Sequence, residues 1–448
     1  MKRLTMSLRS DSNTRMFILL IVSIASLFIE IVAARLYNIL YSGIETLVLS
    51  EIFFVSGIII FSTSHTFILM NIRKRMKDLP GIKRHTLKYM MQYMIIVQIV
   101  LNVLMMIILF QILNNLSYKT YLVITMVSIS YLSGIINISL LTEKFTRWIL
   151  NKRTYVSLSF CIAIGSVLVS MLSSFIFILR TLSLQPKGIT WHAGILSVPI
   201  SDFTLTLSQI YSVFFIISYV ASWLATITVL HNYSFKIGKA KFWAFVILPL
   251  LYFIGEFEPL YFPLLSEYRR MDPVGFTVTY VLIFSSIRFG GALFFGIGFW
   301  VMSRNIEKKL LKTFLNISAY GLILLFVTNQ ASLLLNNLFP PLGLITASFV
   351  GLSSFLLLVG TYSAALYVSN DMNLRRTIRT SVEKQARLIG YIGTAEFQDK
   401  LSSKVSAMLN NLPTSLQDKQ MELSFTDDDI RTYTNEVIEE LSRRKKLK

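Results

Sequence analysis

The chain has 448 residues, of which 54% are hydrophobic and only 15% are charged, and its formal net charge is +19. An average soluble domain carries about 25% charged residues, and a water-soluble core cannot absorb so much apolar surface. The composition therefore excludes an ordinary soluble protein and indicates that lipid surrounds most of the chain.

Ten apolar runs, each near the length that crosses a bilayer, follow one another along the chain. Crossing the hydrocarbon takes about 20 residues of α-helix, and the runs lack the alternation of membrane β-strands. We therefore predict an all-α polytopic bundle of about ten transmembrane helices. The runs cover residues 16–36, 47–70, 89–113, 120–141, 155–179, 209–230, 242–264, 276–302, 314–337 and 344–368.

Lysine and arginine are concentrated on alternate connections between these runs. The N-terminal stretch and the connections 71–88, 142–154, 231–242 and 303–313 hold 22 of the 43 basic residues, whereas the intervening connections hold six. Short basic loops stay on the cytoplasmic side during insertion. We therefore predict a cell-membrane protein with both termini cytoplasmic, and we assign the net charge to topology and lipid contact instead of nucleic-acid binding.

Several ionisable and amide side chains lie inside the runs, where they are costly unless they face the bundle interior. Glu30 in the first run and Arg288 in the eighth both have small residues three and four positions away, which lets a partner helix pack closely. We hypothesise that Arg288 pairs with Glu30 or with Glu256. The candidate polar cluster comprises Glu30, Glu51, Glu256, Glu258, Arg288, Asn329 and Gln330.

Two interpretations of this cluster stay open on sequence grounds. The side chains form either a polar pocket that opens to the outside, or a set of interhelical hydrogen bonds and one ion pair that fix helix register. Each such hydrogen bond contributes about 0.6 to 2 kcal/mol. Gln98 and Asn102, four residues apart in the third run, belong to the same group of intramembrane polar side chains.

No motif with a known catalytic or metal-binding chemistry occurs in the chain. The sequence lacks the GxGxxG, GxxxxGK[ST], HExxH and GxSxG patterns. The four histidines fall in different segments, and the single cysteine, Cys161, lies in the fifth run. We therefore expect no disulfide, no metal site, no cofactor, no catalytic residue and no enzymatic activity.

The composition changes after the last run, so we divide the chain into a bundle of residues 1–369 and a cytoplasmic tail of residues 370–448. The tail holds 14 basic and 12 acidic residues. We expect the last span to continue into it as an amphipathic helix, a break at Gly390 and Gly393, and a further helix from Ala395. The predicted interaction residues are Leu374, Ile378, Val382, Ile430, Tyr433, Val437 and Leu441.

The tail also carries a resemblance. The segments Asn373-Leu374-Arg375-Arg376-Thr377-Ile378-Arg379 and Ile392-Gly393-Thr394-Ala395-Glu396, placed after ten spans, resemble uncharacterised multi-pass membrane proteins of ammonia-oxidising archaea. The resemblance implies an archaeal cytoplasmic membrane. It brings no activity and no site residues.

Regular spans, an outer polar cluster and a helical tail favour a non-enzymatic sensor, receptor-like protein or scaffold component. Its expected partners are the lipid bilayer and either a cytoplasmic protein or a second copy of the chain, bound through the tail. A solvated tail that only touches lipid is the alternative for that region. The alternative function is a secondary transporter that uses the outer carboxylates for a proton or a cation, although the two halves lack matching Gly or Pro breaks.

Overall fold

The structure is a computed structural model, and its all-α architecture agrees with the predicted fold class. Within the described residues, nine helices are long and apolar enough to cross a membrane, so the chain is a membrane protein built from transmembrane helices. The described ranges are 12–40, 44–77, 84–151, 153–190, 201–231, 238–251, 263–304, 306, 308–330, 339–371 and 387–410.

The nine spanning helices follow nine of the ten apolar runs. Most extend beyond the run because a helix continues past the hydrocarbon into its polar ends; α13 differs, since it ends at Thr328 and not near residue 337. The helices are α2 (Ser12–Leu40), α3 (Ile44–Met76), α4 (Arg84–Asn115), α5 (Thr120–Asn151), α6 (Tyr155–Ser183), α7 (Asp202–Leu230), α12 (Pro273–Arg304), α13 (Lys309–Thr328) and α15 (Leu344–Asn370).

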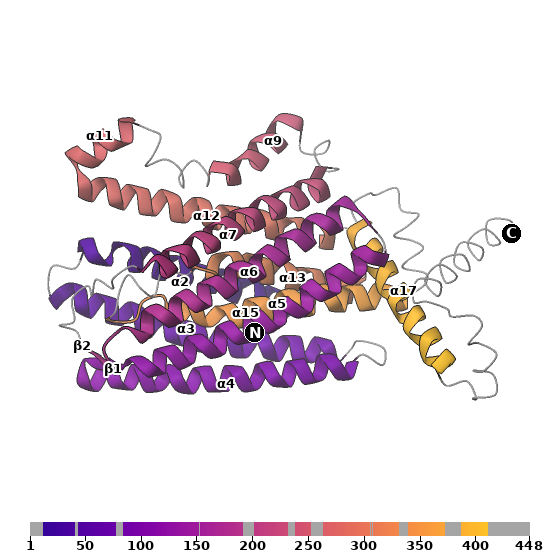
Figure 1. The fold of residues 1–448 in the computed structure, drawn as a ribbon, viewed down its shortest axis with the longest axis horizontal. Helices are drawn as coiled ribbons and strands as arrows, with labels where there is room; N and C mark the ends of the chain where they lie inside the picture. Colours follow the sequence, from indigo (N-terminus) through magenta and orange to yellow (C-terminus); the bar gives the residue numbers. More distant parts are fainter. Residues whose placement is uncertain are drawn as a thin grey trace, which may run out of the picture.

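The seventh predicted span, 242–264, is not a continuous helix in the part of the chain that the structure describes. The short helix α9 (Lys239–Ile247) leads into the 3₁₀ turn η2 (Leu248–Leu250), which contains Pro249, and α11 (Pro263–Met271) precedes α12. Proline lacks the N–H that a continuing α-helix needs. Helix α7 ends and α12 begins at opposite ends of the bundle (Figure 1).

A small antiparallel sheet, which the sequence analysis did not predict, lies at one end of the bundle. Its strand β1 (Ser117–Lys119) pairs with β2 (Gly188–Thr190), with Tyr118 opposite Ile189. The Tyr118 ring stacks on Phe339 with 6.3 Å between the ring centroids. We call this the sheet end, and the opposite end, where α17 (Arg387–Asn410) lies, the α17 end (Figure 1).

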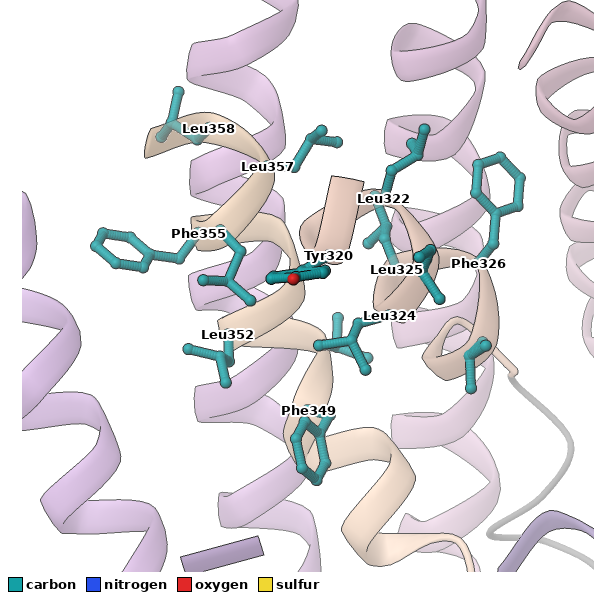
Figure 2. Packing of buried hydrophobic residues seen from close by; sticks show 14 of the residues in the cluster. Tyr320, Leu322, Leu324, Leu325, Phe326, Phe349, Leu352, Phe355, Leu357 and Leu358 are labelled. Carbon is teal, nitrogen blue, oxygen red and sulfur yellow. The ribbon is translucent and has the colours of Figure 1, made fainter. Parts of the chain in front are cut away.

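Helices α13 and α15 form the centre of the bundle (Figure 1). Every residue of α15 except Tyr367 and Asn370 is buried, as expected for a helix that is apolar on all sides. Figure 2 shows the packing of aromatic and leucine side chains from both helices, including Phe326 of α13 and Phe355 of α15. The remaining spanning helices surround this pair.

The α17 helix packs against α5 and α15. The structure of this region differs from two predictions for the tail. First, α15 does not continue past Asn370, because Asp371 has an extended backbone (φ −100°, ψ 100°). Second, Gly393 does not break α17, which runs through it. A Cβ atom on Gly393 would clash with the side chain of Val368, so the glycine allows α17 to approach α15 closely.

Polar contacts join α17 to both helices. Trp148 Nε1 donates a hydrogen bond to Glu396 Oε2 at 3.3 Å, and Lys400 Nζ donates to Ser369 Oγ at 2.8 Å and to Asn370 Oδ1 at 2.9 Å. The predicted tail interaction residues lie outside the described ranges: Leu374, Ile378, Val382, Ile430, Tyr433, Val437 and Leu441.

Candidate functional site at the junction of the two central helices

The apolar centre of the bundle is interrupted where α13 ends and α15 begins. We call residues 329–346 the junction; residues 331–338 of it lie outside the described part of the chain. A helix end leaves backbone N–H or C=O groups without partners in its own helix. In an apolar environment each such group costs several kcal/mol unless another segment supplies a partner. The junction is therefore where charged side chains are needed.

Glu30 of α2 supplies the partners at the beginning of α15. Its Oε1 accepts hydrogen bonds from the backbone N–H of Gly343 at 2.8 Å and of Ile345 at 3.2 Å. Its Oε2 accepts from the N–H of Thr346 at 2.8 Å and from the Thr346 hydroxyl at 2.6 Å. The side chain is buried, with 5% of its surface exposed. Glu30 thus caps α15 from a different helix.

The local sequence explains why the cap comes from elsewhere. The N-cap residue of α15 is Gly343, which has φ +96° and no side chain to accept a hydrogen bond. Glycine suits this left-handed backbone conformation, which other residues adopt only with strain. Because the usual Ser, Thr, Asp or Asn cap is absent, the N–H groups at the start of α15 depend on Glu30.

Arg288 of α12 has the matching role at the end of α13. Its Nη2 donates to the backbone carbonyl of Asn329, the C-cap residue of α13, at 3.0 Å and to the Tyr211 hydroxyl at 3.3 Å. The Tyr211 hydroxyl donates to the same carbonyl at 2.8 Å. The guanidinium also lies over the Phe215 ring, 4.2 Å from its centroid. Arg288 therefore binds a helix C-terminus and an aromatic face.

Two amide side chains extend the junction toward further helices. Asn329 Nδ2 donates to Ser170 Oγ of α6 at 3.0 Å. Arg35 of α2 donates from Nη2 to Gln330 Oε1 at 3.2 Å. Helix α2 thus contacts both sides of the junction, since Glu30 binds the start of α15 and Arg35 binds the residue that follows the cap of α13. The junction joins side chains from α2, α6, α7 and α12.

The charges at the junction match the helix dipoles. The N-terminus of a helix carries partial positive charge and its C-terminus partial negative charge, so a carboxylate stabilises the first and a guanidinium the second. In partly buried geometries each interaction contributes up to about 2 kcal/mol. Glu30 and Arg288 therefore neutralise opposite helix ends, and the predicted Arg288–Glu30 ion pair is wrong because the Glu30 oxygens bind α15 instead.

Among the described residues, the remaining predicted intramembrane polar side chains form no hydrogen bond to the junction. Glu51 lies in α3, and its Oε1 is buried without a hydrogen-bond partner in the described residues. Gln98 donates to Asn102 at 3.0 Å within α4, so these two amides form a pair of their own. Glu256 and Glu258 lie outside the described ranges, so the Arg288–Glu256 pairing stays a prediction. The structure brings Glu30, Arg288, Asn329 and Gln330 to one junction.

No sequence pattern singled out Arg35, Tyr211 or Ser170 as a site residue. Arg35 counted only as a charge near the end of the first run, and neither Tyr211 nor Ser170 differs in pattern from other polar residues in the spans. One signal was present: Gly343 precedes an apolar helix that lacks a polar N-cap, so an acceptor had to come from another segment.

The groups that surround the Glu30 carboxylate are hydrogen-bond donors. These N–H and O–H groups stabilise the anionic carboxylate, whereas a metal cation requires oxygen, nitrogen or sulfur ligands. Among the described residues, no group of three or more His, Cys, Asp or Glu side chains has the arrangement of a metal site. Asn329 Oδ1 is buried without a hydrogen-bond partner in those residues.

Comparison with protein-family models, with curated proteins and with solved structures finds no match to this chain. The resemblance of the tail to archaeal membrane proteins therefore stays a prediction.

Proposed function

We propose that the protein is a non-enzymatic sensor, receptor-like protein or scaffold component of the cell membrane, and that α15 transmits changes at the junction to the α17 end. The observation that carries the proposal is that one helix has both contacts. Glu30 caps the first residues of α15, and Lys400 of α17 binds Ser369 and Asn370 at its last turn. A 27-residue helix is about 40 Å long.

The packing around α15 supports transmission by a shift of the whole helix. Ser130 Oγ of α5 donates to the carbonyl of Ala347 at 2.8 Å and accepts from the N–H of Gly351 at 3.2 Å. These contacts lie near the junction, whereas Val368 contacts Gly393 near the other end. A tightly packed helix responds to a change at one end by moving as a unit, since packed interfaces change between discrete arrangements.

The charge distribution supports a cytoplasmic position for the α17 end. Arg73 lies in the last turn of α3 and Lys144 in the last quarter of α5, whereas Lys88 and Lys309 lie in the first two turns of α4 and α13. These four helix ends are at the α17 end (Figure 1). Basic residues of short connections remain cytoplasmic. In the proposed orientation both termini and the tail are in the cytoplasm, where the tail binds a cytoplasmic protein or a second copy of the chain.

Hydrogen–deuterium exchange of the full-length protein in nanodiscs tests the coupling. Gln at position 30 keeps one carbonyl oxygen for Gly343 and Ile345 but places an NH₂ group against the N–H of Thr346. We expect Glu30→Gln to increase exchange in residues 387–410, whereas the control Glu51→Gln, also a neutralised intramembrane acid, leaves it unchanged. Exchange at the α17 end of α4 serves as the internal reference, because global loosening would increase exchange there as well.

An increase in α17 and not in α4 supports coupling through α15. No change in α17, or an equal increase in both helices, contradicts it.

Crosslinking in cells tests the partner. Full-length protein should capture a cytoplasmic protein or its own second copy, and deletion of residues 373–448 should abolish that product while the protein still inserts. A product that persists after the deletion contradicts a role of the tail in partner binding.

One observation favours the alternative function. Helix α13 ends at Thr328, before the end of the apolar run 314–337, and carriers place their binding sites at helices that are broken within the membrane. A transporter would give proton or cation flux in liposomes that Glu30→Gln or Glu256→Gln abolishes. Because the Glu30 carboxylate already accepts hydrogen bonds from four donors, we expect no such flux.

A further inference from the structure

A basic cavity lies between α3 and α4, at a distance from the junction. Its volume is about 440 Å³, and its lining residues are Arg73, Met76, Lys77, Lys88, Met91, Gln92 and Ile95. The first three come from the last turn of α3 and the residue after it, and the others from the first turns of α4. The cavity is therefore at the α17 end of the bundle (Figure 1).

The lining has a charged part and an apolar part. Arg73, Lys77 and Lys88 are exposed, and none of them forms a salt bridge within the described residues. Between Ile52 and Asn115 the sequence contains one acidic residue, Asp78, against seven lysines and arginines; Asp78 lies outside the described residues. The charged part of the cavity thus attracts an anion.

The apolar part distinguishes the ligand from a simple ion. Met76 and Met91 are buried and Ile95 is half-buried, so they offer a surface for hydrocarbon beside the cations. The cavity also lies at the boundary of the spans, because the candidate spans of α3 and α4 end at Met76 and begin at Leu87. In a bilayer that these helices cross, the ends of the spans lie where lipid headgroups meet acyl chains.

We propose that this cavity binds a phosphate group, with Arg73, Lys77 and Lys88 as the cationic ligands and Gln92 as an amide donor. The apolar lining and the depth favour the headgroup of an anionic phospholipid as the source, with the start of an acyl chain against Met91 and Ile95. Basic pockets between transmembrane helices bind anionic headgroups by this combination of charge and apolar contact. Lysine and arginine supply charge-assisted hydrogen bonds to phosphate oxygens.

Native mass spectrometry of the full-length protein in detergent tests the proposal with phosphatidylglycerol as the probe and phosphatidylcholine as the neutral comparison. The cavity variant carries Arg73→Gln, Lys77→Gln and Lys88→Gln. The control variant carries Lys74→Gln, Lys309→Gln and Lys312→Gln, which remove three exposed basic residues of the same end that do not line the cavity. We expect the Kd of the first phosphatidylglycerol to rise at least about tenfold in the cavity variant relative to the control.

Equal weakening in the two variants would show that bulk charge alone attracts the lipid and would overturn the proposal. An unchanged Kd in the cavity variant would overturn it as well. All six substituted side chains are exposed, so the core stays intact, and the unfolding temperature of each variant verifies this.

The source of the phosphate is tested with glycerol 3-phosphate, which has the phosphate without acyl chains, and with Ile95→Trp, which fills the apolar part. For a lipid site, glycerol 3-phosphate competes weakly, and Ile95→Trp reduces retention of phosphatidylglycerol only. If glycerol 3-phosphate competes as strongly as the lipid and Ile95→Trp has no effect, the phosphate site is supported and its source is a soluble phosphate.

Discussion

Glu30 is an acid inside a membrane helix, and such residues often belong to proton or ion pathways. In this chain both carboxylate oxygens accept hydrogen bonds from the first residues of α15. The carboxylate is thereby matched to the positive end of the helix dipole. The bonds explain why a costly charge is retained at this position, since without it the N–H groups of a buried helix end would lack acceptors.

We expect Glu30→Ala to destabilise the protein by about 3 kcal/mol, because three backbone N–H groups lose their acceptor in a buried site. The matched change Glu51→Ala should cost less than about 1 kcal/mol, since the Glu51 Oε1 has no hydrogen-bond partner to lose in the described residues. Reversible unfolding in mixed micelles measures both values. Similar losses of stability for the two variants would contradict the capping role.

Arg288 illustrates how a charge can be bound by neutral groups. Its guanidinium binds the Asn329 carbonyl and lies over the Phe215 ring. Both partners carry negative partial charge toward it, the first from the end of α13 and the second from the aromatic face. The hypothesised Arg288–Glu30 pair joined two opposite charges directly, whereas the fold places each of these two charges at the helix end of opposite sign.

At the scale of elements, α17 is positioned by shape as much as by polar contacts. Ile389, Ile392 and Ala395 are buried against the bundle, and Gly393 provides the close approach to Val368. A glycine within a helix lowers the stability of that helix by about 1 kcal/mol relative to alanine. Gly393 therefore weakens α17 by itself but allows it to dock closely against α15.

Gly393→Ala separates these two effects. The alanine should raise the intrinsic helix propensity of α17 but weaken its docking by about 1–3 kcal/mol through the clash with Val368. Hydrogen–deuterium exchange in residues 387–410 should therefore increase. Val368→Ala, added to the same protein, removes the clashing methyl groups but keeps the Cβ atom of residue 368, which also lies too close, so it should restore protection only in part. Ser403→Ala, an exposed change in α17, should have no effect. Lower exchange in Gly393→Ala alone would contradict the docking contact.

At the scale of the whole molecule, the ends of α2 and α15 show that the bundle begins and finishes at the same end. Glu30, in the second half of α2, contacts the start of α15 near the sheet end, so α2 begins at the α17 end, where α15 also finishes. An even number of traverses follows. Basic residues of the connections then predict which compartment that end faces.

Cysteine labelling of sealed, right-side-out vesicles tests this orientation. In a Cys161→Ser background, Lys187→Cys at the sheet end should react with an impermeant maleimide from outside, because Lys187 is exposed. Ser403→Cys in α17 should react only after permeabilisation. The opposite labelling pattern would invert the proposed orientation while leaving the helical bundle intact.

The sequence alone determined the class of the protein, the nine spanning helices of the described residues and the need for buried partners around Glu30 and Arg288. These properties follow from the free energy of placing single residues in lipid, which is local and additive along a helix. Tertiary structure decided which groups meet, because contacts such as Glu30 to Gly343 or Gly393 to Val368 join distant segments. It also turned Gly393 from an expected break into a packing contact, since a glycine's role depends on the surface opposite it.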